Sequence, residues 1–351
     1  MLNNKTLIQR ILISRLRFIG DVILTTPVIK ALKKHYPRAS IHYLAEKVPG
    51  SVLANNPYLD EVIVLPQELL PSKAIITRFS EHVRFLKNLR QRQFDLVIDF
   101  LGNPRSAFLT LATGAPYRIG YDLRVRGKAY NIKIKRSDSP RALDAYLDAL
   151  HTLGIPIDDK RTKVYFSGKD MEWAQKLLEG ILPQNPGPLI ALNLGASWPA
   201  KTWSMSKFSE LARQLIKRFN STILLVVGPG QQKKIANFNF MFDQPCPIVE
   251  TNSLTRLAAV ISHCNMYISN DCGPMHLAAA VGTPTIGIFG PSSPDIWFPY
   301  QEENGCVGLR NETENCCGRD FCSRSLPCIN LISPQVVFKT VEALLRKFNY
   351  L

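Results

Sequence analysis

The fold is decided by the stretch Asn270-Asp271-Cys272-Gly273-Pro274-Met275-His276-Leu277-Ala278-Ala279-Ala280. The apolar residues 266–269 come before it and predict a strand, and the alanine- and leucine-rich residues 274–281 predict a helix. A second apolar run, residues 285–289, follows Val281-Gly282-Thr283-Pro284 and predicts another strand. The order strand, turn, helix, strand is typical of an α/β protein with a parallel sheet.

The turn of this unit carries side chains that suit a bound anion. A helix N-terminus has unpaired N–H groups and about half a positive charge, so it attracts phosphate. Asp271 could accept from the first turn as its N-cap, Gly273 lets a ligand approach the backbone, and His276 could donate to a phosphate oxygen. The same pattern also fits a well-capped core helix that binds nothing, so other segments must decide between the two.

The composition is that of a globular protein with two domains. The chain has 351 residues, 46% of them hydrophobic, with 24 prolines spread along it. No apolar run approaches the roughly 20 residues that span a bilayer. Basic residues interrupt the N-terminal apolar segment, which therefore lacks the core of a signal peptide. We expect a cytoplasmic protein.

The net charge of +15 is concentrated in the N-terminal half and is densest between Arg118 and Arg136. Such a patch attracts nucleic acid, anionic lipid headgroups or phosphorylated glycans, or it is a solvated surface without a partner. The chain has no helix-turn-helix, zinc-finger or RNP-type signature. Nucleic-acid binding therefore rests on charge alone, and we expect no nucleic-acid partner.

Strand-like and helix-like segments alternate along the whole chain, which predicts parallel sheets. The predicted strands are residues 10–15, 41–44, 62–65, 96–100, 189–194, 222–227, 247–250, 266–269 and 285–289. The predicted helices are residues 22–35, 79–92, 106–112, 142–153, 206–219, 254–262 and 274–281. The proline-rich residues 183–188 suit a linker, so we expect a first domain at 1–182 and a second at 183–332.

Residues 333–351 predict a terminal amphipathic helix. Ser333 can cap it, Pro334 suits its first position, and one apolar stripe is made by Val337, Val341, Leu344, Leu345 and Phe348. A helix of this kind needs a surface to cover, and it could cross back to the first domain.

A second strand, turn and helix occurs at residues 11–24, with Gly20 in the turn and Asp21 at the mouth of the helix. In a doubly wound sheet the carboxyl ends of the strands line the ligand crevice. Asp21 is therefore placed to act as a general base, or else it caps the helix. Neither G-x-G-x-x-G nor G-x-x-x-x-G-K-[ST] occurs, which disfavours an NAD-dependent enzyme and excludes P-loop chemistry.

A third segment, residues 193–203, follows a predicted strand and carries Ser197 and Lys201 together with two tryptophans, Trp198 and Trp203. A hydroxyl and a lysine on a short loop could hold a diphosphate, with the lysine acting as a point charge. Loop lysines are often only solvated. This one is predicted at the same sheet end as Asp271 and His276, which favours a binding role.

Together these segments resemble glycosyltransferase family 9, the bacterial lipopolysaccharide heptosyltransferases, over nearly the whole chain. The resemblance rests on the order and spacing of residues 17–27, 94–103, 118–121, 195–203 and 271–291. It implies a GT-B fold, in which two Rossmann-like, doubly wound parallel-sheet domains face each other across a cleft. The C-terminal domain would bind ADP-heptose, and the N-terminal domain would bind the lipid A–Kdo inner core.

The resemblance also implies roles for single residues. Asp21 matches the catalytic base, which takes the proton of the acceptor hydroxyl as that oxygen displaces ADP with inversion. The nucleotide sugar would be bound by Ser197, Lys201, Gln231, Asp271, Cys272, Gly273, Met275 and His276. The acceptor would be bound by Arg17, Asn103, Arg105, Arg118, Arg124, Arg126 and Lys128. The family needs no metal or other cofactor for transfer, and the chain has no D-x-D pair.

Two positions depart from the family pattern. Cys272 stands where the family often has threonine, and Gln231 stands near where it often has an acidic residue beside the ribose. A glutamine can also bind a ribose hydroxyl, and we still expect ADP as the nucleotide.

A cysteine cluster lies near the end of the chain, at Cys316, Cys317, Cys322 and Cys328. Its spacing is not that of a standard zinc ribbon, so a zinc or iron–sulfur site and reduced structural cysteines both remain open. A similar tail occurs in the branch that resembles heptosyltransferase II, which adds the second heptose.

We therefore expect an inverting, metal-independent heptosyltransferase that acts on heptosyl-Kdo-lipid A at the cytoplasmic face of the inner membrane. Alternatives within the class are transfer of the first heptose to Kdo-lipid A and use of another nucleotide sugar. A protein that only binds a nucleotide sugar or an anionic glycolipid is the alternative from a different class. The combination of Asp21, Lys201 and His276 favours an enzyme, because a binder has no use for a base.

Overall fold

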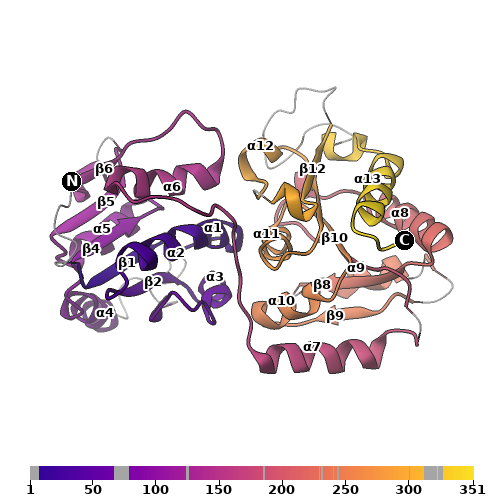
Figure 1. The fold of residues 1–351 in the computed structure, drawn as a ribbon, viewed down its shortest axis with the longest axis horizontal. Coiled ribbons are helices and arrows are strands. Elements are labelled where there is room, and N and C mark those ends of the chain that lie inside the picture. The colour runs from indigo at the N-terminus through magenta and orange to yellow at the C-terminus, as the bar shows by residue number, and fades with distance from the viewer. Residues whose placement is uncertain are drawn as a thin grey trace. The chain divides into compact units, whose positions relative to one another are not determined.

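The computed structural model describes residues 8–66, 79–123, 126–184, 186–228, 230, 232–239, 241–242, 245–299, 301–311, 322 and 327–351. The chain folds into two compact units, Met1–Lys163 and Val164–Leu351 (Figure 1). Each unit is an α/β domain with its own parallel sheet, as the alternation of strands and helices predicted.

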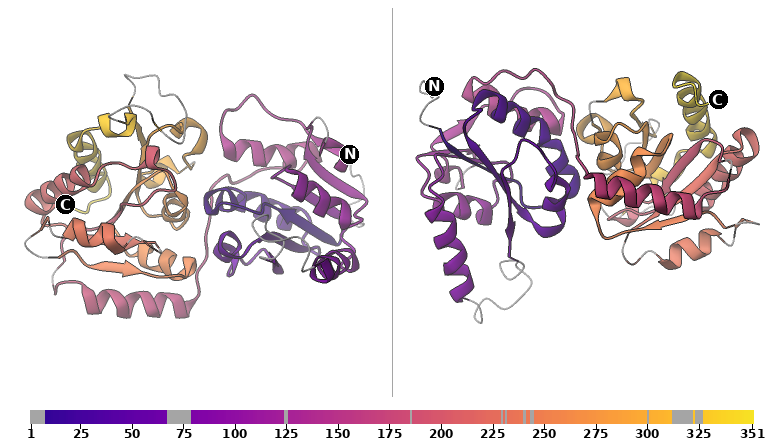
Figure 2. Two further views of the ribbon diagram at one scale, coloured as in Figure 1. Left: turned by 180° about the vertical axis from the view of Figure 1, so that it is seen from behind. Right: turned by 60° about the horizontal axis from the view of Figure 1, so that its bottom comes forward.

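The first unit contains a parallel sheet in the order β3-β2-β1-β4-β5-β6. Its strands are β1 Arg10–Ser14, β2 Ser40–Glu46, β3 Glu61–Leu65, β4 Leu96–Asp99, β5 Tyr117–Tyr121 and β6 Ile132–Ile134. Its helices are α1 Ile19–Leu24, α2 Thr26–His35, α3 Lys47–Gly50, α4 Phe79–Gln91, α5 Pro104–Ala112 and α6 Ala142–Leu153. Helices α2 and α6 pack together over one face of the sheet, and α4 and α5 pack together over the other (Figure 2).

The second unit contains a parallel sheet in the order β12-β11-β10-β7-β8-β9. Its strands are β7 Leu189–Asn193, β8 Thr222–Val227, β9 Ile248–Glu250, β10 Met266–Asn270, β11 Thr285–Phe289 and β12 Val307–Arg310. Its helices are α7 Gly168–Ile181, α8 Met205–Phe219, α9 Gln232–Asn239, α10 Leu254–Ser262, α11 Gly273–Ala280, α12 Pro294–Trp297 and α13 Pro334–Lys347.

The two sheets have the same topology. In each unit the first strand lies in the middle, the next two strands extend to one side and the last three to the other. The strand order therefore reverses between β1 and β4 in the first sheet, and between β7 and β10 in the second sheet. In doubly wound sheets, ligands bind beyond the carboxyl ends of the strands at such switch points. Ligand-binding residues are therefore expected just after these four strands.

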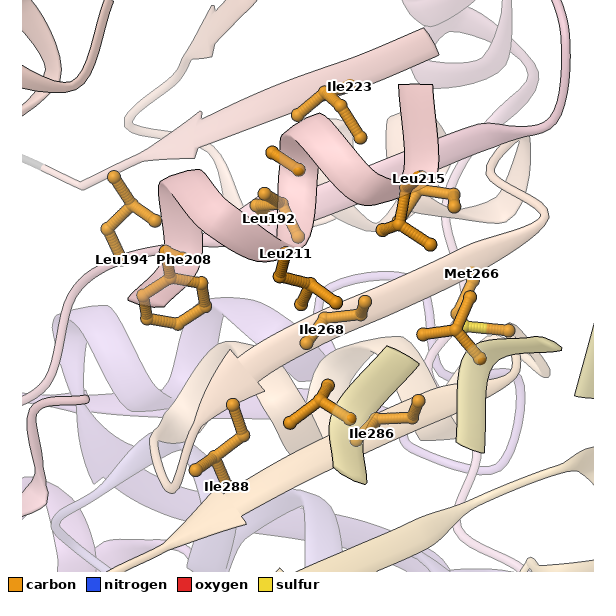
Figure 3. Close-up of a cluster of buried hydrophobic side chains, with 14 of the residues drawn as sticks. Leu192, Leu194, Phe208, Leu211, Leu215, Ile223, Met266, Ile268, Ile286 and Ile288 are labelled. Atoms are coloured by element: carbon orange, nitrogen blue, oxygen red, sulfur yellow. The ribbon is translucent and has the colours of Figure 1, made fainter. Parts of the chain in front are cut away.

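A dense apolar core lies on one face of the second sheet (Figure 3). Alternate residues of the strands, such as Leu192, Ile268 and Ile288, point to the same side and meet Phe208 and Leu211 of α8. Helix α13 covers the same core with the stripe predicted from the sequence, of which Val337, Val341, Leu344 and Leu345 are buried.

Helix α13 begins as predicted, and it packs against its own unit. The Ser333 side chain accepts from the Val336 N–H at 3.3 Å, and Pro334 occupies the first turn. The helix contacts α8, and both belong to the second unit. The apolar stripe is therefore buried on α8 of the same unit, whereas the sequence left a return to the first domain possible.

The domain boundary also differs from the expected one at residues 182 and 183. The division falls between Lys163 and Val164, because α7 packs against α10 of the second unit. The proline-rich residues 183–188 connect α7 with β7 inside that unit. A proline-rich stretch marks any loop, and its position alone does not distinguish a linker between domains from a loop within one.

A clash explains why glycine occupies position 120 in β5. A Cβ there would lie 2.7 Å from three ring atoms of Tyr130. That ring cannot retreat easily, because its hydroxyl donates to Asp99 Oδ2 at 2.6 Å in the buried interior.

Gly120→Ala is therefore expected to lower the free energy of unfolding by about 1–3 kcal/mol, the usual cost of overpacking. Denaturant unfolding of the full chain measures it, with Gly180→Ala as the control, since a Cβ at Gly180 meets no atom within 4 Å. Equal stability of the two variants would contradict the packing argument.

None of the helices in the described part of the chain is long and apolar enough to cross a membrane.

Candidate active site

Asp21 follows β1 in the chain and lies in the first turn of α1, at the switch point of the first unit. It is the third residue of α1 and is only 8% exposed. Its Oδ1 atom accepts from the hydroxyl of Tyr146 at 2.6 Å and is 2.9 Å from Nη2 of Arg15. The N-cap position belongs to Phe18, so the alternative that Asp21 caps the helix is wrong.

Both partners of Asp21 keep their protons. Burial lowers the pKa of the Arg15 guanidinium, but Tyr146 and Asp21 beside it outweigh burial and raise that pKa above its ordinary value. Burial, together with the charge of Asp21, raises the pKa of the Tyr146 phenol well above its ordinary value. The carboxylate therefore faces one permanent cation and one permanent hydroxyl donor.

The residue that precedes α1 has a strained backbone. Phe18 has φ 68° and ψ 119°, a conformation that side chains other than glycine rarely adopt. The residue is 61% exposed, so packing does not compensate for the strain. The turn that positions Asp21 therefore contains a residue, Phe18, with an energetically unfavourable backbone conformation.

Phe18→Gly is therefore expected to raise the free energy of unfolding by about 1 kcal/mol. Relief of roughly 1–3 kcal/mol of strain exceeds the ~0.5–1 kcal/mol entropic cost of a glycine. Chemical denaturation measures the change. Phe18→Ala, which removes the ring and keeps the strain, should show no gain, and a lower stability of the glycine variant would refute the strain.

At the switch point of the second unit, Lys201 and Asp271 form an ion pair. Lys201 ends a short 3-10 helix after β7, Pro199–Lys201, and Asp271 directly follows β10. The Lys201 Nζ lies 2.6 Å from Asp271 Oδ2, and their side chains are 20% and 7% exposed. The Ser292 hydroxyl, in the loop after β11, donates to the same oxygen. Loops after three neighbouring strands thus converge on one carboxylate.

Helix α11 begins beside this ion pair. Its N-cap is Cys272, not Asp271, because the helix starts at Gly273 and the Asp271 carboxylate is occupied by Lys201. Burial raises the pKa of the Cys272 thiol to about 12, so this thiol is uncharged. Met275 and His276 are buried within the first turn.

Of the residues predicted to bind the nucleotide sugar, Lys201 and residues 271–276 therefore gather at the carboxyl edge of this sheet. Ser197 lies exposed on the same loop after β7 as Lys201.

Two of the predicted acceptor residues come together at the carboxyl end of the first sheet. Arg17 Nε lies 3.4 Å and Arg105 Nη1 3.8 Å from Glu46 Oε1, at the end of β2. Asn103 has a structural role here, since it caps α5 by accepting from the Ser106 N–H at 2.8 Å.

The other predicted acceptor residues lie elsewhere on the first unit. Arg118 is near the amino end of β5, and its guanidinium donates to the carbonyl oxygens of Ala115 and Ala129. Arg126 and Lys128 are exposed on the short helix Arg126–Ala129. The structure therefore does not bring Arg118 together with Arg17 and Arg105, because the Arg118 guanidinium is held by these two carbonyl groups near the amino end of β5.

Some predicted residues lie outside the described part of the chain: Arg124, Gln231, Cys316 and Cys317. Of the remaining cysteines in the cluster, Cys328 is buried and Cys322 half-buried. Among the described residues there is no group of three or more His, Cys, Asp or Glu that could hold a metal ion.

Sequence reasoning missed three residues of these sites: Arg15, Tyr146 and Ser292. Arg15 and Ser292 follow strands directly or closely, and that position was a usable signal. Tyr146 is 125 residues from Asp21, and no local pattern connects the two.

The chain is similar in sequence to known proteins over most of its length. Residues 82–324 match the model of "Glycosyltransferase family 9 (heptosyltransferase)". The chain is 27% identical to lipopolysaccharide heptosyltransferase 3 of Escherichia coli over 296 residues, which cover 81% of this chain and 84% of that protein. It is 24% identical to lipopolysaccharide heptosyltransferase 2 of Salmonella typhimurium, over 96% of this chain and 99% of that one.

A solved structure shows the same fold over nearly the whole length of the chain. The E. coli ADP-heptose lps heptosyltransferase II superposes with a TM-score of 0.79 at 21% identity, covering 97% of this chain and 100% of that chain.

Proposed function

The chain belongs to glycosyltransferase family 9 and is a glycosyltransferase, and we propose that it transfers heptose from ADP-heptose to the inner core of lipopolysaccharide with Asp21 as the general base. The proposal is supported by relatives that are lipopolysaccharide heptosyltransferases, one of them described with ADP-heptose. The observation that carries the base assignment is the buried Asp21 carboxylate at the switch point, with its Oδ1 atom held by two donors.

In the proposed reaction, Asp21 takes the proton of an acceptor hydroxyl through Oδ2. The hydroxyl oxygen forms a bond to the anomeric carbon of the heptose, and the bond from that carbon to the diphosphate breaks. ADP leaves with the electron pair, and the configuration at the carbon is inverted. A general base of this kind contributes about 10²–10⁴-fold to a rate.

The leaving diphosphate would lie against the second unit's ion pair and the start of α11. Lys201 supplies a cation, and the N–H groups around Gly273 supply the positive end of the helix. These groups stabilise the negative charge that develops on ADP in the transition state. We propose that transfer needs no metal, so a chelator should leave the rate unchanged.

The acceptor we favour is heptosyl-Kdo-lipid A, which corresponds to addition of the second heptose. Kdo-lipid A is the alternative for a first transfer. The 27% identity to a heptosyltransferase 3 supports a third candidate, an acceptor that already carries two heptoses. The basic residues of the first unit, Arg17 and Arg105 among them, would face the anionic acceptor at the cytoplasmic surface of the inner membrane.

The proposed function is tested by ADP release from ADP-heptose with purified protein. Kdo-lipid A and its forms with one and two heptoses are compared as acceptors. Acceptor-dependent release with the one-heptose form supports the favoured reaction, and preference for another form reassigns the step. Protein that binds ADP but releases none with any acceptor would refute ADP-heptose as the donor.

A further inference from the structure

Among the described residues, the contacts to the Asp21 carboxylate are made at one of its two oxygens. Arg15 Nη2 and the Tyr146 hydroxyl both meet Oδ1, at 2.9 Å and 2.6 Å. Within the described part of the chain, no residue donates to Oδ2. The two donors come from separate elements, the loop after β1 and helix α6. One oxygen is therefore anchored, while the other is left for a ligand.

Arg15 is an unfavourable residue for stability alone. Its side chain is 9% exposed, and its Nε and Nη1 atoms are buried without a hydrogen-bond partner among the described residues. A buried N–H group without a partner costs about 1–3 kcal/mol. A structural arginine normally uses several of its five donors, as Arg118 does with two carbonyl groups. In the part of the chain that the structure describes, the carboxylate that Arg15 contacts is that of Asp21.

Tyr146 is held rigidly where it meets Asp21. Its ring packs edge-on against Phe100, with the ring centroids 5.3 Å apart, and α6 also contacts α1 and α2. Leu147 and Leu150 anchor the same helix in the interior. The phenol is therefore a fixed donor, and it sets the direction in which the second carboxylate oxygen points.

We infer that Arg15 and Tyr146 are positioning residues that hold Asp21 by one oxygen, so that Oδ2 meets the acceptor hydroxyl. This inference rests on the proposed role of Asp21 as the base. A base that is misplaced by about 1 Å can lose roughly 10²-fold in rate, so anchoring has a large effect on turnover. Substrate affinity is affected little, because neither residue needs to touch a substrate.

The test uses the full chain and measures kcat and KM for ADP release. Tyr146→Phe is expected to lower kcat about 10-fold, with both KM values within about twofold, because the carboxylate becomes free to turn. Arg15→Met should lower kcat about 50-fold, and Arg15→Lys should restore part of that loss, because it returns the charge without the fork. If Arg15→Met fails to fold, Tyr146→Phe still decides the matter.

A double-substitution cycle separates positioning from a general structural effect. In an Asp21→Asn background, Tyr146→Phe should cause no further fall in kcat, because its target has lost its function. Tyr130→Phe is the matched control, since Tyr130 also donates to a buried carboxylate, that of Asp99, at 2.6 Å. It should lower thermal stability but leave kcat near that of the wild type.

The outcomes distinguish this inference from the proposed function. If Asp21→Asn is slow but Tyr146→Phe turns over normally, the positioning role is wrong and the base stands. An equal loss from Tyr146→Phe in both backgrounds also refutes positioning. If Asp21→Asn turns over normally, or if the wild type releases no ADP, the base assignment falls and this inference falls with it.

Discussion

Replacing Asp21 with asparagine is expected to slow heptose transfer about 10³-fold, within the range that a general base contributes. Asparagine has the same shape, so the contacts of Oδ1 with Arg15 and Tyr146 survive. What is lost is the ability to take a proton from the acceptor hydroxyl. ADP affinity should stay within about twofold, because Asp21 belongs to the first unit and the proposed diphosphate site to the second.

This expectation is checked by steady-state ADP release and by calorimetric titration with ADP. Asp148→Asn is a suitable control, because Asp148 is a buried carboxylate of the same unit that accepts from the Ser137 N–H at 2.9 Å. It should change stability without the large loss of turnover. Near-normal turnover by Asp21→Asn would exclude the carboxylate as the base.

Replacing Lys201 with methionine is expected to weaken ADP and ADP-heptose binding about 100-fold. Truncating one partner of a buried charge pair costs 2–5 kcal/mol or more, which covers a change of this size. The reason is twofold: the diphosphate loses a cation, and the Asp271 carboxylate, 2.6 Å from Nζ, becomes an uncompensated negative charge beside it. Turnover should fall with affinity.

The effect of the uncompensated Asp271 charge can be separated from the loss of the Lys201 cation. Lys201→Met combined with Asp271→Asn removes the stranded charge, so part of the affinity should return. Lys207→Met is the control, because its Nζ contacts the carbonyl of Ile332 at 3.2 Å rather than a carboxylate. Calorimetric titration with ADP measures the affinity of the wild type and of these three variants. Unaltered ADP affinity of Lys201→Met would rule out a role of Lys201 in binding the diphosphate.

The sequence predicted elements whose signal is local. The strand at 266–269 became β10 Met266–Asn270, and the helix at 254–262 is α10 Leu254–Ser262. Short strands escaped prediction: β5 carries Arg118 between apolar residues, and β6 has three residues. Their pairing with β4 and with each other makes them strands, and pairing is not visible in a short window.

The candidate site was predictable to the extent that its residues follow strands. Asp21, Lys201 and Asp271 all come after central strands of their sheets, and these strands were visible in the sequence. Their partners were harder to find. The hydrogen bond between Asp21 and Tyr146 joins residues that come together only when α6 packs on the folded sheet. Asp271 does not cap its helix as expected, because its carboxylate is paired with Lys201.

Helix α13 has a consequence for how such enzymes diverge. Because it packs on α8, every core helix of the second unit comes from one uninterrupted stretch of chain, and the chain passes between the units only at residues 163 and 164. Substitutions that remodel one half leave the interior of the other undisturbed. Under the proposed division of roles, substitutions in the first unit would change the acceptor while the second unit keeps its binding of ADP-heptose, and recombination near that junction would exchange acceptor specificities.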